Sequence, residues 1–352
     1  MTEIRRDDLL RLLAAIPAPD VYNEVILRPD GDVPLAMLRP AGQPPRAFVL
    51  QDGAAVELLP ENDPDLPASK LFGKKSRMLR ALQPLLGPVE EPKLVAWRPG
   101  KRAVVRVKLG DGALFVKFLD RKTYRRAAGV FEALPMAVPP MEFARATQLL
   151  GELCAYVAPA APGVCLREIL AKGERPSWAL LDDAIRALAA TPVHAGMPVV
   201  DFATAKDAGV RMLQKGAVMV PELAARAERL AALGSPSSVR RGFVHGDFHD
   251  RQVFLTHDRV HLIDLETVGS GDANFDLVNM AEQVRLRSLQ QNGSDDGTGA
   301  ALLDRFGVEE DVRWRWGVCV RARLCGVYAL RPRWAELVRR LLSEVDGMLA
   351  RG

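Results

Sequence analysis

The 352-residue sequence lacks the features that mark secreted disulfide scaffolds and membrane proteins. Its four cysteines show no C-x-x-C spacing and are too sparse for a disulfide framework. No apolar run approaches the roughly 20 residues that a membrane-spanning helix needs. The first residues carry Asp7 and Asp8 within an apolar pattern, which is not typical of a signal or transit peptide. We therefore expect a reduced, cytoplasmic setting and no membrane partner.

The sequence also lacks a strong excess of charge of one sign. The 48 Lys and Arg against 44 Asp and Glu give a formal net charge of +4. This charge is too small and too dispersed for nucleic-acid binding, which needs a clustered basic face. It suits anionic ligands such as nucleotides. Apolar residues make up 48% and charged residues 26%, as in ordinary globular proteins. The length allows two domains or one two-lobed domain, and the oligomeric state stays unknown.

The first half of the chain is expected to be rich in β-structure. Short runs rich in β-branched and other apolar residues are separated by turns that contain Asp-Gly or Pro-Gly, including residues 30–32. The predicted strands cover residues 23–28, 34–38, 47–51, 54–59, 93–98, 103–109 and 113–119. The last three strands, joined by tight turns, predict an antiparallel meander. Helical patterns are predicted at residues 1–16, 70–86 and 122–134.

The second half is expected to be mainly helical. The predicted helices cover residues 178–190, 221–233, 278–290, 311–330 and 334–349. Residues 243–266 interrupt them with short apolar runs that predict strands and loops, and residues 291–298 are predicted to be a mobile loop. The fold class is therefore α+β, with a β-rich N-terminal half and a helical C-terminal half that holds one compact polar cluster.

That cluster contains acidic residues directly after apolar runs. Asp264 follows the apolar residues 260–263, and Asp247 lies in a loop after another apolar run. A carboxylate in such a place is costly to bury unless it is paired or bound to metal. Two such groups can divide phosphoryl transfer, one orienting the acceptor hydroxyl and the other holding Mg²⁺. The side-chain carbonyl of Gln252 can supply a further oxygen ligand to a hard cation.

The order of these residues resembles the aminoglycoside phosphotransferase/choline kinase-like family. The resemblance rests on H-G-D at residues 245–247, an amide five residues after Asp247, an I-D pair ending at Asp264, and G-D…D at residues 271–276. It covers roughly residues 90–340 and implies the two-lobed protein-kinase fold. It divides the chain into an N-terminal extension (1–88), a kinase-like N-lobe (89–158) and a helical C-lobe (159–352). The sequence departs from the family at Gln252, where Asn is usual; Gln keeps the carbonyl and adds one methylene.

The resemblance implies roles for the polar cluster. Asp247 would be the catalytic carboxylate, and His245 and Asp272 would brace its loop. Asp264 would bind Mg²⁺, with the carbonyl of Gln252 as a further ligand and Glu266 as an additional carboxylate. Asp276 would support the site. The residues assigned here are His245, Asp247, Gln252, Asp264, Glu266, Asp272 and Asp276.

The N-terminal half offers matching parts for a nucleotide. Lys117, in the third strand of the meander, would neutralise phosphates and would pair with Glu132 on the next helix. The turn after the first strand would cover the phosphates, and the connector that follows residue 154 would bind the base through its backbone. The residues assigned to the nucleotide are Lys117, Glu132, Gly100, Lys101, Arg102, Tyr156 and Val157.

The predicted function is that of a small-molecule kinase. It would transfer the γ-phosphate of ATP or GTP, with Mg²⁺, to a hydroxyl of a sugar, amino alcohol or antibiotic. One alternative is a nucleotide-binding pseudokinase, favoured by Gln252 and by the single glycine of the phosphate turn. Another is a metal-dependent phosphohydrolase using His249 and Asp250, but only one further histidine, His194, precedes the cluster. The acidic residues of the C-terminal half are interleaved with arginines, which favours a modest metabolite over a polycation.

Overall fold

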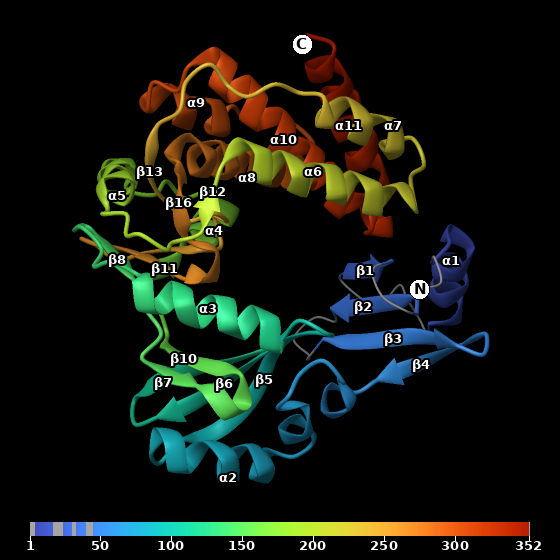
Figure 1. Ribbon diagram of the computed structural model, residues 1–352, viewed down its shortest axis with the longest axis vertical. Helices are drawn as coiled ribbons and strands as arrows, with labels where there is room; N and C mark the ends of the chain where they lie inside the picture. Colours follow the sequence, from blue (N-terminus) through green and yellow to red (C-terminus); the bar gives the residue numbers. More distant parts are fainter. Residues whose placement is uncertain (1–3, 17–23, 30–32, 40–44, 352) are drawn as a thin grey trace. The chain divides into compact units, whose positions relative to one another are not determined.

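The chain divides into two compact units. A computed structural model describes residues 4–16, 24–29, 33–39 and 45–351 (Figure 1). The first unit comprises Met1–Gly129, Arg145–Ala160 and Leu330–Arg333, and the second comprises Val130–Ala144, Ala161–Ala329 and Trp334–Gly352. The N-terminal extension therefore belongs to the same compact unit as the strands that follow it.

The extension is one helix on a small antiparallel sheet. The strands β1 (Glu24–Arg28), β2 (Leu35–Arg39), β3 (Arg46–Gln51) and β4 (Ala54–Leu58) pair in sequence order (Figure 1). The helix α1 (Arg6–Ala15) buries Leu9 and Leu12 and packs against β2, β3 and β4. These strands match the predicted ones within about two residues, as boundaries read from sequence commonly do. The turn predicted at residues 30–32 lies outside the described residues.

The rest of the first unit is a five-stranded antiparallel sheet with the order β5-β6-β7-β10-β9. Its strands are β5 (Glu90–Arg98), β6 (Arg102–Leu109), β7 (Gly112–Leu119), β9 (Gln148–Leu150) and β10 (Ala155–Pro159). The core beneath includes Val105, Val116 and Phe118, all nearly inaccessible to solvent. The helix α2 (Lys75–Leu86) packs on β5, and α3 (Arg121–Ala133) follows β7. The predicted meander is confirmed as β5–β7.

The second unit combines two small sheets with a set of helices. One sheet has the order β11 (Val164–Cys165), β14 (Val253–Leu255), β15 (Val260–Leu262) and β8 (Met141–Phe143), and the other has β12 (Val199–Val200), β16 (Gly269–Asp272) and β13 (Arg241–Val244). The helices are α4 (Leu166–Ala171), α5 (Trp178–Ala190), α6 (Phe202–Ala217), α7 (Leu223–Ala231), α8 (Ala273–Asn292), α9 (Thr298–Arg305), α10 (Glu310–Ala329) and α11 (Ala335–Leu349). The loops between β13 and β14 and between β15 and β16 carry the polar cluster. In the described part of the chain, no helix has the length and apolar character to cross a membrane.

The helix α6 was not predicted, because its stability comes from packing on α10. Two glycines lower its intrinsic helix propensity. A Cβ at Gly209 would lie 3.1 Å from the carbonyl oxygen of Cys319, and one at Gly216 would lie 3.0 Å from Cα of Gly326. The two helices run side by side at this close approach (Figure 1). The short helices α4 and α9 were also not predicted.

Candidate active site

The loop that carries Asp247 is hydrogen-bonded to the buried side chain of Asp276. The carboxylate of Asp276, near the start of α8, accepts the backbone N–H of His245 at 2.5 Å and that of Gly246 at 3.0 Å. Gly246 has φ +79°, and a Cβ there would lie 2.4 Å from the carbonyl oxygen of Thr267. Only glycine fits this conformation without strain. The H-G-D sequence therefore encodes a tight turn fixed to α8.

His245 joins the two loops of the cluster. Its side chain is fully buried. Nδ1 lies 3.4 Å from the backbone N–H of Asp247, and Nε2 lies 2.9 Å from the carbonyl oxygen of Ile263. Burial lowers the pKa of His245. The neutral ring, with its proton on Nε2, satisfies both contacts at once, because Nδ1 then accepts and Nε2 donates. His245 thus sets the loop of Asp247 beside the residue that precedes Asp264.

Asp247 stays accessible and ionised. Its side chain is 38% exposed, and its carboxylate lies 3.6 Å from Arg323 on α10 and 3.7 Å from Nε2 of His249. Burial alone would raise the pKa of Asp247, but the neighbouring His249 and the charge of Arg323 outweigh it and lower the pKa. A carboxylate held ionised, with room beside it, can orient a hydroxyl group.

His249 lies between two carboxylates. Its Nδ1 is 3.6 Å from the fully buried Asp250, which Arg287 contacts from the other side at 3.2 Å. Burial alone would lower the pKa of His249, but Asp247 and Asp250 outweigh it and raise the pKa to about 9. The same Nδ1 accepts the backbone N–H of Arg251 at 3.1 Å, so His249 is fixed within the loop by its main chain as well as by the two carboxylates.

Asp264 and Gln252 form the oxygen-rich side of the cluster. Asp264 has φ 59° and ψ 50°, a left-handed conformation that few residues other than glycine adopt. The side-chain amide nitrogen of Gln252 lies 3.2 Å from Asp264 Oδ2 and 3.3 Å from Nε2 of His249. Gln252 is buried, and Glu266 is half-buried two residues beyond Asp264.

This donor set fits Mg²⁺ better than a transition metal. Among the described residues, no three His, Cys, Asp or Glu side chains gather in a way that could hold a metal ion by themselves. Mg²⁺ is usually bound by one or two carboxylates, with water and substrate phosphates supplying the remaining oxygens. Asp264 can provide such a carboxylate, and a rotation of the Gln252 amide would present its oxygen to the same point.

The two aspartates predicted to brace the site have different surroundings. Asp276 bonds the backbone of the catalytic loop. Asp272 caps α8 instead: its carboxylate accepts the backbone N–H groups of Arg240 and Asn274 and the indole N–H of Trp316 at 2.9 Å. Its hydrogen bonds therefore fix the start of the helix that carries Asp276, and its contribution to the loop is indirect.

The residues predicted to bind the nucleotide lie mostly in the first unit. Lys117 is 5% exposed on β7, and its Nζ lies 5.7 Å from the ring centroid of Tyr156. Tyr156 and Val157 are in the middle of β10, which pairs with β7 on one side and β9 on the other. The carbonyl of Val157 accepts the N–H of Thr147. Tyr156 and Val157 therefore lie in a strand and not in a connector, and their base-binding role stays a prediction.

Two further predictions concern the turn after β5 and the helix α3. Gly100 has φ +67°, Lys101 is exposed and Arg102 begins β6. The carbonyl of Lys101 accepts the N–H of Asp120 at 3.1 Å. Glu132 is exposed near the end of α3, within the second unit. Its pairing with Lys117 stays a prediction.

Sequence reasoning missed the residues that come to Asp247 from other helices. Arg323 donates to the side-chain oxygen of Asn279 at 2.8 Å, and the amide nitrogen of Asn279 donates to the carbonyl of Phe248 at 2.8 Å. Asn279 is fully buried on α8. The available signal was the presence of two arginines, Arg321 and Arg323, inside the otherwise apolar stretch of residues 317–328, because a cation in apolar surroundings requires a partner.

Comparisons with known proteins identify the family and the fold of the chain. A model of the phosphotransferase enzyme family matches residues 76–315. The fold is similar to that of the choline kinase LicA from Streptococcus pneumoniae, at 12% identity and TM-score 0.51, covering 79% of this chain and 99% of that one. It is also similar to the apo form of a thermostable mutant of aminoglycoside phosphotransferase APH(4)-Ia, at 11% identity and TM-score 0.52, covering 78% and 98%. No curated protein sequence matches the chain.

These identities support likeness of fold alone, whereas the family model covers well over half of the sequence, including the whole polar cluster. The fold is the two-lobed kinase-like one, with a β-rich N-terminal region. The chain therefore belongs to the phosphotransferase enzyme family.

Proposed function

We propose that this phosphotransferase moves the γ-phosphate of ATP or GTP to a hydroxyl group of a small metabolite in the cytoplasm. The observation that carries the proposal is the convergence of two loops on one site. An ionised, accessible Asp247 lies on the first loop, and Asp264 in contact with Gln252 lies on the second. The buried ring of His245 contacts the main chain of both loops. This arrangement supports one group that orients the acceptor beside another that holds the donor phosphates.

In this proposal Asp247 orients the acceptor hydroxyl and receives its proton. Its lowered pKa makes it a weak base. That suits phosphoryl transfer through a loose transition state, in which the hydroxyl loses its proton late and correct placement matters more than basicity. Arg323 and His249 lie near the two carboxylate oxygens, and the 38% exposure of the side chain leaves room for the hydroxyl.

Asp264, Gln252 and Glu266 are proposed as the residues that hold Mg²⁺. When bound, the ion would neutralise charge on the phosphates of the donor. The left-handed backbone of Asp264 turns its carboxylate out of the strand direction, toward Gln252. Lys117, buried on β7, is proposed to bind the phosphates between the sugar and the γ-position, with Glu132 as its partner.

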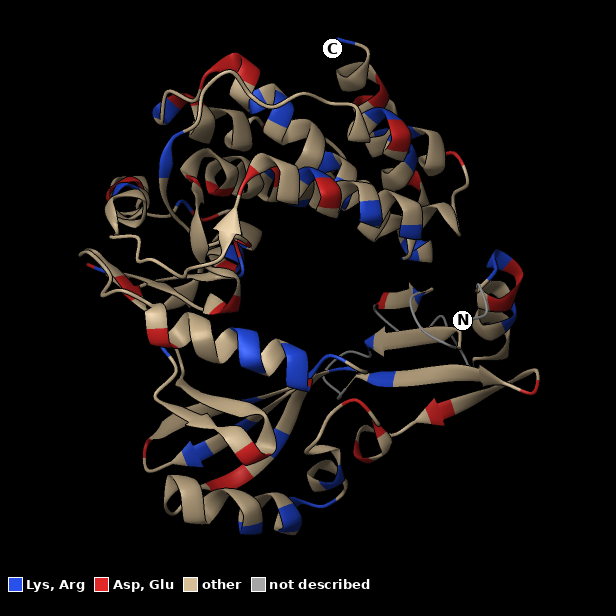
Figure 2. Ribbon diagram, viewed as in Figure 1, with Lys and Arg blue, Asp and Glu red and all other residues tan. Residues whose placement is uncertain are grey.

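The charges of the second unit favour a sugar or amino alcohol over a polycationic acceptor. Acidic and basic segments alternate along its helices (Figure 2). Glu282 pairs with Arg321, Asp311 with Arg315, and Asp295 with Arg285. Carboxylates already neutralised by arginine offer little attraction to a polycation. The arginine beside Asp247 would repel one further.

The test is a screen for nucleotide consumption with sugars, amino alcohols and aminoglycosides as acceptors, using ATP and GTP separately. We expect acceptor-dependent turnover in the wild-type chain and none in Asp264→Asn, measured in parallel. Nucleotide-induced thermal stabilisation without turnover on any acceptor would favour the pseudokinase instead. Equal turnover in Asp264→Asn would contradict the assignment of the metal site.

A further inference from the structure

The turn between β5 and β6 is held by two buried charges from the N-terminal extension. The carboxylate of Asp63 accepts the backbone N–H of Gly100 and the indole N–H of Trp97, each at 2.9 Å. The guanidinium of Arg28 donates to the carbonyl of Pro99 at 3.0 Å. Asp63 is 1% exposed and Arg28 is 9% exposed. Two charged side chains distant in sequence thus bond two consecutive residues of one turn.

Such burial is costly unless the charges meet well-placed partners. Hydrogen bonds to an ionised group are shorter and stronger than neutral ones, so these contacts fix the turn firmly. The space is also tight: a Cβ at Gly100 would lie 2.9 Å from the carboxylate of Asp65, and the N–H of Asp65 donates to Asp63. The conformation of the turn is therefore determined by the extension as well as by its own strands.

The strand that supplies Arg28 is itself anchored. In β1, the N–H of Leu27 donates to the carbonyl of Leu330 at 2.8 Å, and Glu24 pairs with Arg331 at 2.7 Å. Residues 330–333 follow α10 directly and belong to the first unit. One five-residue strand therefore contacts both the turn and the segment that leaves α10. Because β1 is bonded to residues 330–331 as well as to the turn, it can hold the turn in one conformation more firmly than the two turn-forming strands alone.

We propose that Asp63 and Arg28 are positioning residues for the donor nucleotide. By holding residues 99–102, they keep the backbone amides and the cations Lys101 and Arg102 in place for the phosphates. The inference rests on the proposed function and on the prediction from the sequence that this turn covers the phosphates of the nucleotide. A turn with one glycine, ordered before binding, loses less entropy when the nucleotide arrives. In this proposal the N-terminal extension orders the turn of residues 99–102 before the nucleotide binds.

The experiment compares Arg28→Met, Arg28→Lys and Asp63→Asn with a matched control, Arg46→Met. Arg46 lies in the same extension sheet and pairs with Glu57 at 2.6 Å, away from the turn. We expect Arg28→Met and Asp63→Asn to raise the nucleotide Kd about tenfold, consistent with the loss of one hydrogen bond to a charged group. The acceptor KM should stay unchanged, and Arg28→Lys should retain part of the affinity. Hydrogen exchange of the Gly100 amide should quicken in Asp63→Asn and Arg28→Met but not in Arg46→Met.

The outcomes separate this inference from the proposed function. A wild-type chain that binds neither ATP nor GTP overturns the proposed function and this inference with it. Wild-type binding that persists unchanged in Arg28→Met and Asp63→Asn, each shown to be folded by its thermal transition, overturns this inference alone. An equal loss of affinity in Arg46→Met also overturns it, because the extension would then act through general stability.

Discussion

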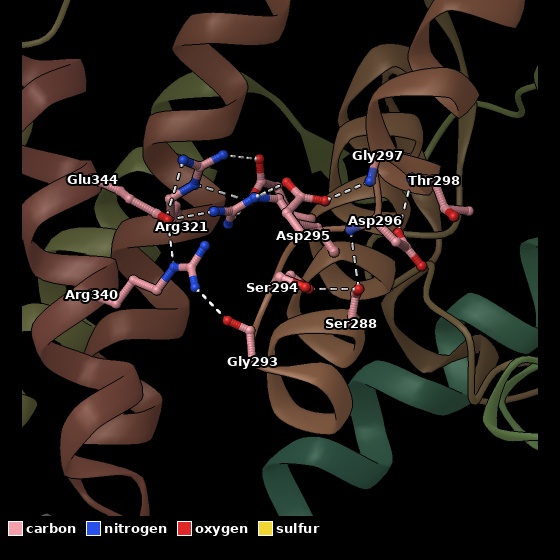
Figure 3. A network of polar contacts seen from close by, with 12 residues as sticks. Ser288, Gly293, Ser294, Asp295, Asp296, Gly297, Thr298, Arg321, Arg340 and Glu344 are labelled. Carbon is pink, nitrogen blue, oxygen red and sulfur yellow. Dashed lines mark hydrogen bonds and ion pairs between the residues drawn. The ribbon is translucent and has the colours of Figure 1, made fainter.

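Two polar regions of the second unit use the same residue types for different ends. In the network that joins α8, α10 and α11, Arg321 bonds Glu282 at 2.6 Å and contacts Glu344 at 3.3 Å, and Arg340 donates to the carbonyl of Gly293 at 2.8 Å (Figure 3). At the loop of residues 245–252, Arg323 of α10 and His249 lie 3.6 and 3.7 Å from the carboxylate of Asp247, beyond hydrogen-bond distance. Charges that are fully satisfied serve structure, whereas a carboxylate left partly satisfied retains the capacity to bind a substrate.

The largest expected effect is that of Asp247→Asn. Since this change removes the proton acceptor and leaves the shape, kcat should fall about a thousandfold, within the range for general acid–base groups. The nucleotide Kd, measured by calorimetry, should change less than about threefold because the donor is held by other residues. Asp258→Asn, a change at an exposed carboxylate in the turn between β14 and β15, is the matched control. Full activity in Asp247→Asn would place the acceptor elsewhere.

The next effect concerns Asp276, which lies beneath the same loop. Burial raises the pKa of Asp276 from 3.8 to about 7, despite the two N–H groups that it accepts. The folded chain therefore holds a proton that the unfolded chain has lost, and stability should fall as the pH rises from about 4 to about 7. In Asp276→Asn this pH dependence of the free energy of unfolding should disappear. The asparagine should also cost about 1–3 kcal/mol at pH 5, because its NH₂ would face a backbone N–H.

Denaturant unfolding of wild type and Asp276→Asn at pH 5, 6, 7 and 8 measures both effects. The difference between the two chains should narrow as the pH rises, because only the wild type must ionise a buried carboxyl group. A slope of equal size in both chains would assign the titration to another group.

The sequence predicted the fold well where the pattern is local. The alternation and tight turns of residues 93–119 specify β5, β6 and β7, since each strand pairs with its neighbour in sequence. It failed at α6, where Gly209 and Gly216 argue against a helix and the compensating contacts come from α10. Secondary structure that depends on a distant partner is not encoded in a local window.

The same distinction holds for the site. Asp247, Gln252 and Asp264 lie close in sequence, so their order predicted a cluster, and Gln252 does contact Asp264. Arg323 could not be placed from its own segment, because α10 reaches the loop only through tertiary packing. Tyr156 was predicted in a connector but lies in the strand β10, because its pairing with β7 joins segments that are distant in sequence.

A smaller effect is expected at Gln252, on the metal side of the loop. Gln252→Ala removes the amide between His249 and Asp264, so the Mg²⁺ concentration for half-maximal rate should rise about tenfold, as for other residues that support metal ligands. Gln252→Asn keeps the side-chain carbonyl, so the Mg²⁺ concentration for half-maximal rate should rise less than in Gln252→Ala. The measurement is the initial rate against free Mg²⁺ at saturating nucleotide. An unchanged Mg²⁺ dependence in Gln252→Ala would remove this residue from the metal site.

The smallest effect is expected for Arg340, at the exposed edge of the network that joins α8, α10 and α11. Arg340 is 42% exposed, contacts Glu344 at 3.3 Å and bonds the carbonyl of Gly293. Exposed ion pairs contribute little, so Arg340→Met should lower the free energy of unfolding by less than about 1 kcal/mol. Arg339→Met, at a 74% exposed position paired with Glu336, is the control for removing a surface charge. Both variants should keep kcat unchanged. A substantial loss of kcat in Arg340→Met, with wild-type stability, would mean that this network acts on the reaction and that the contrast between the two regions does not hold.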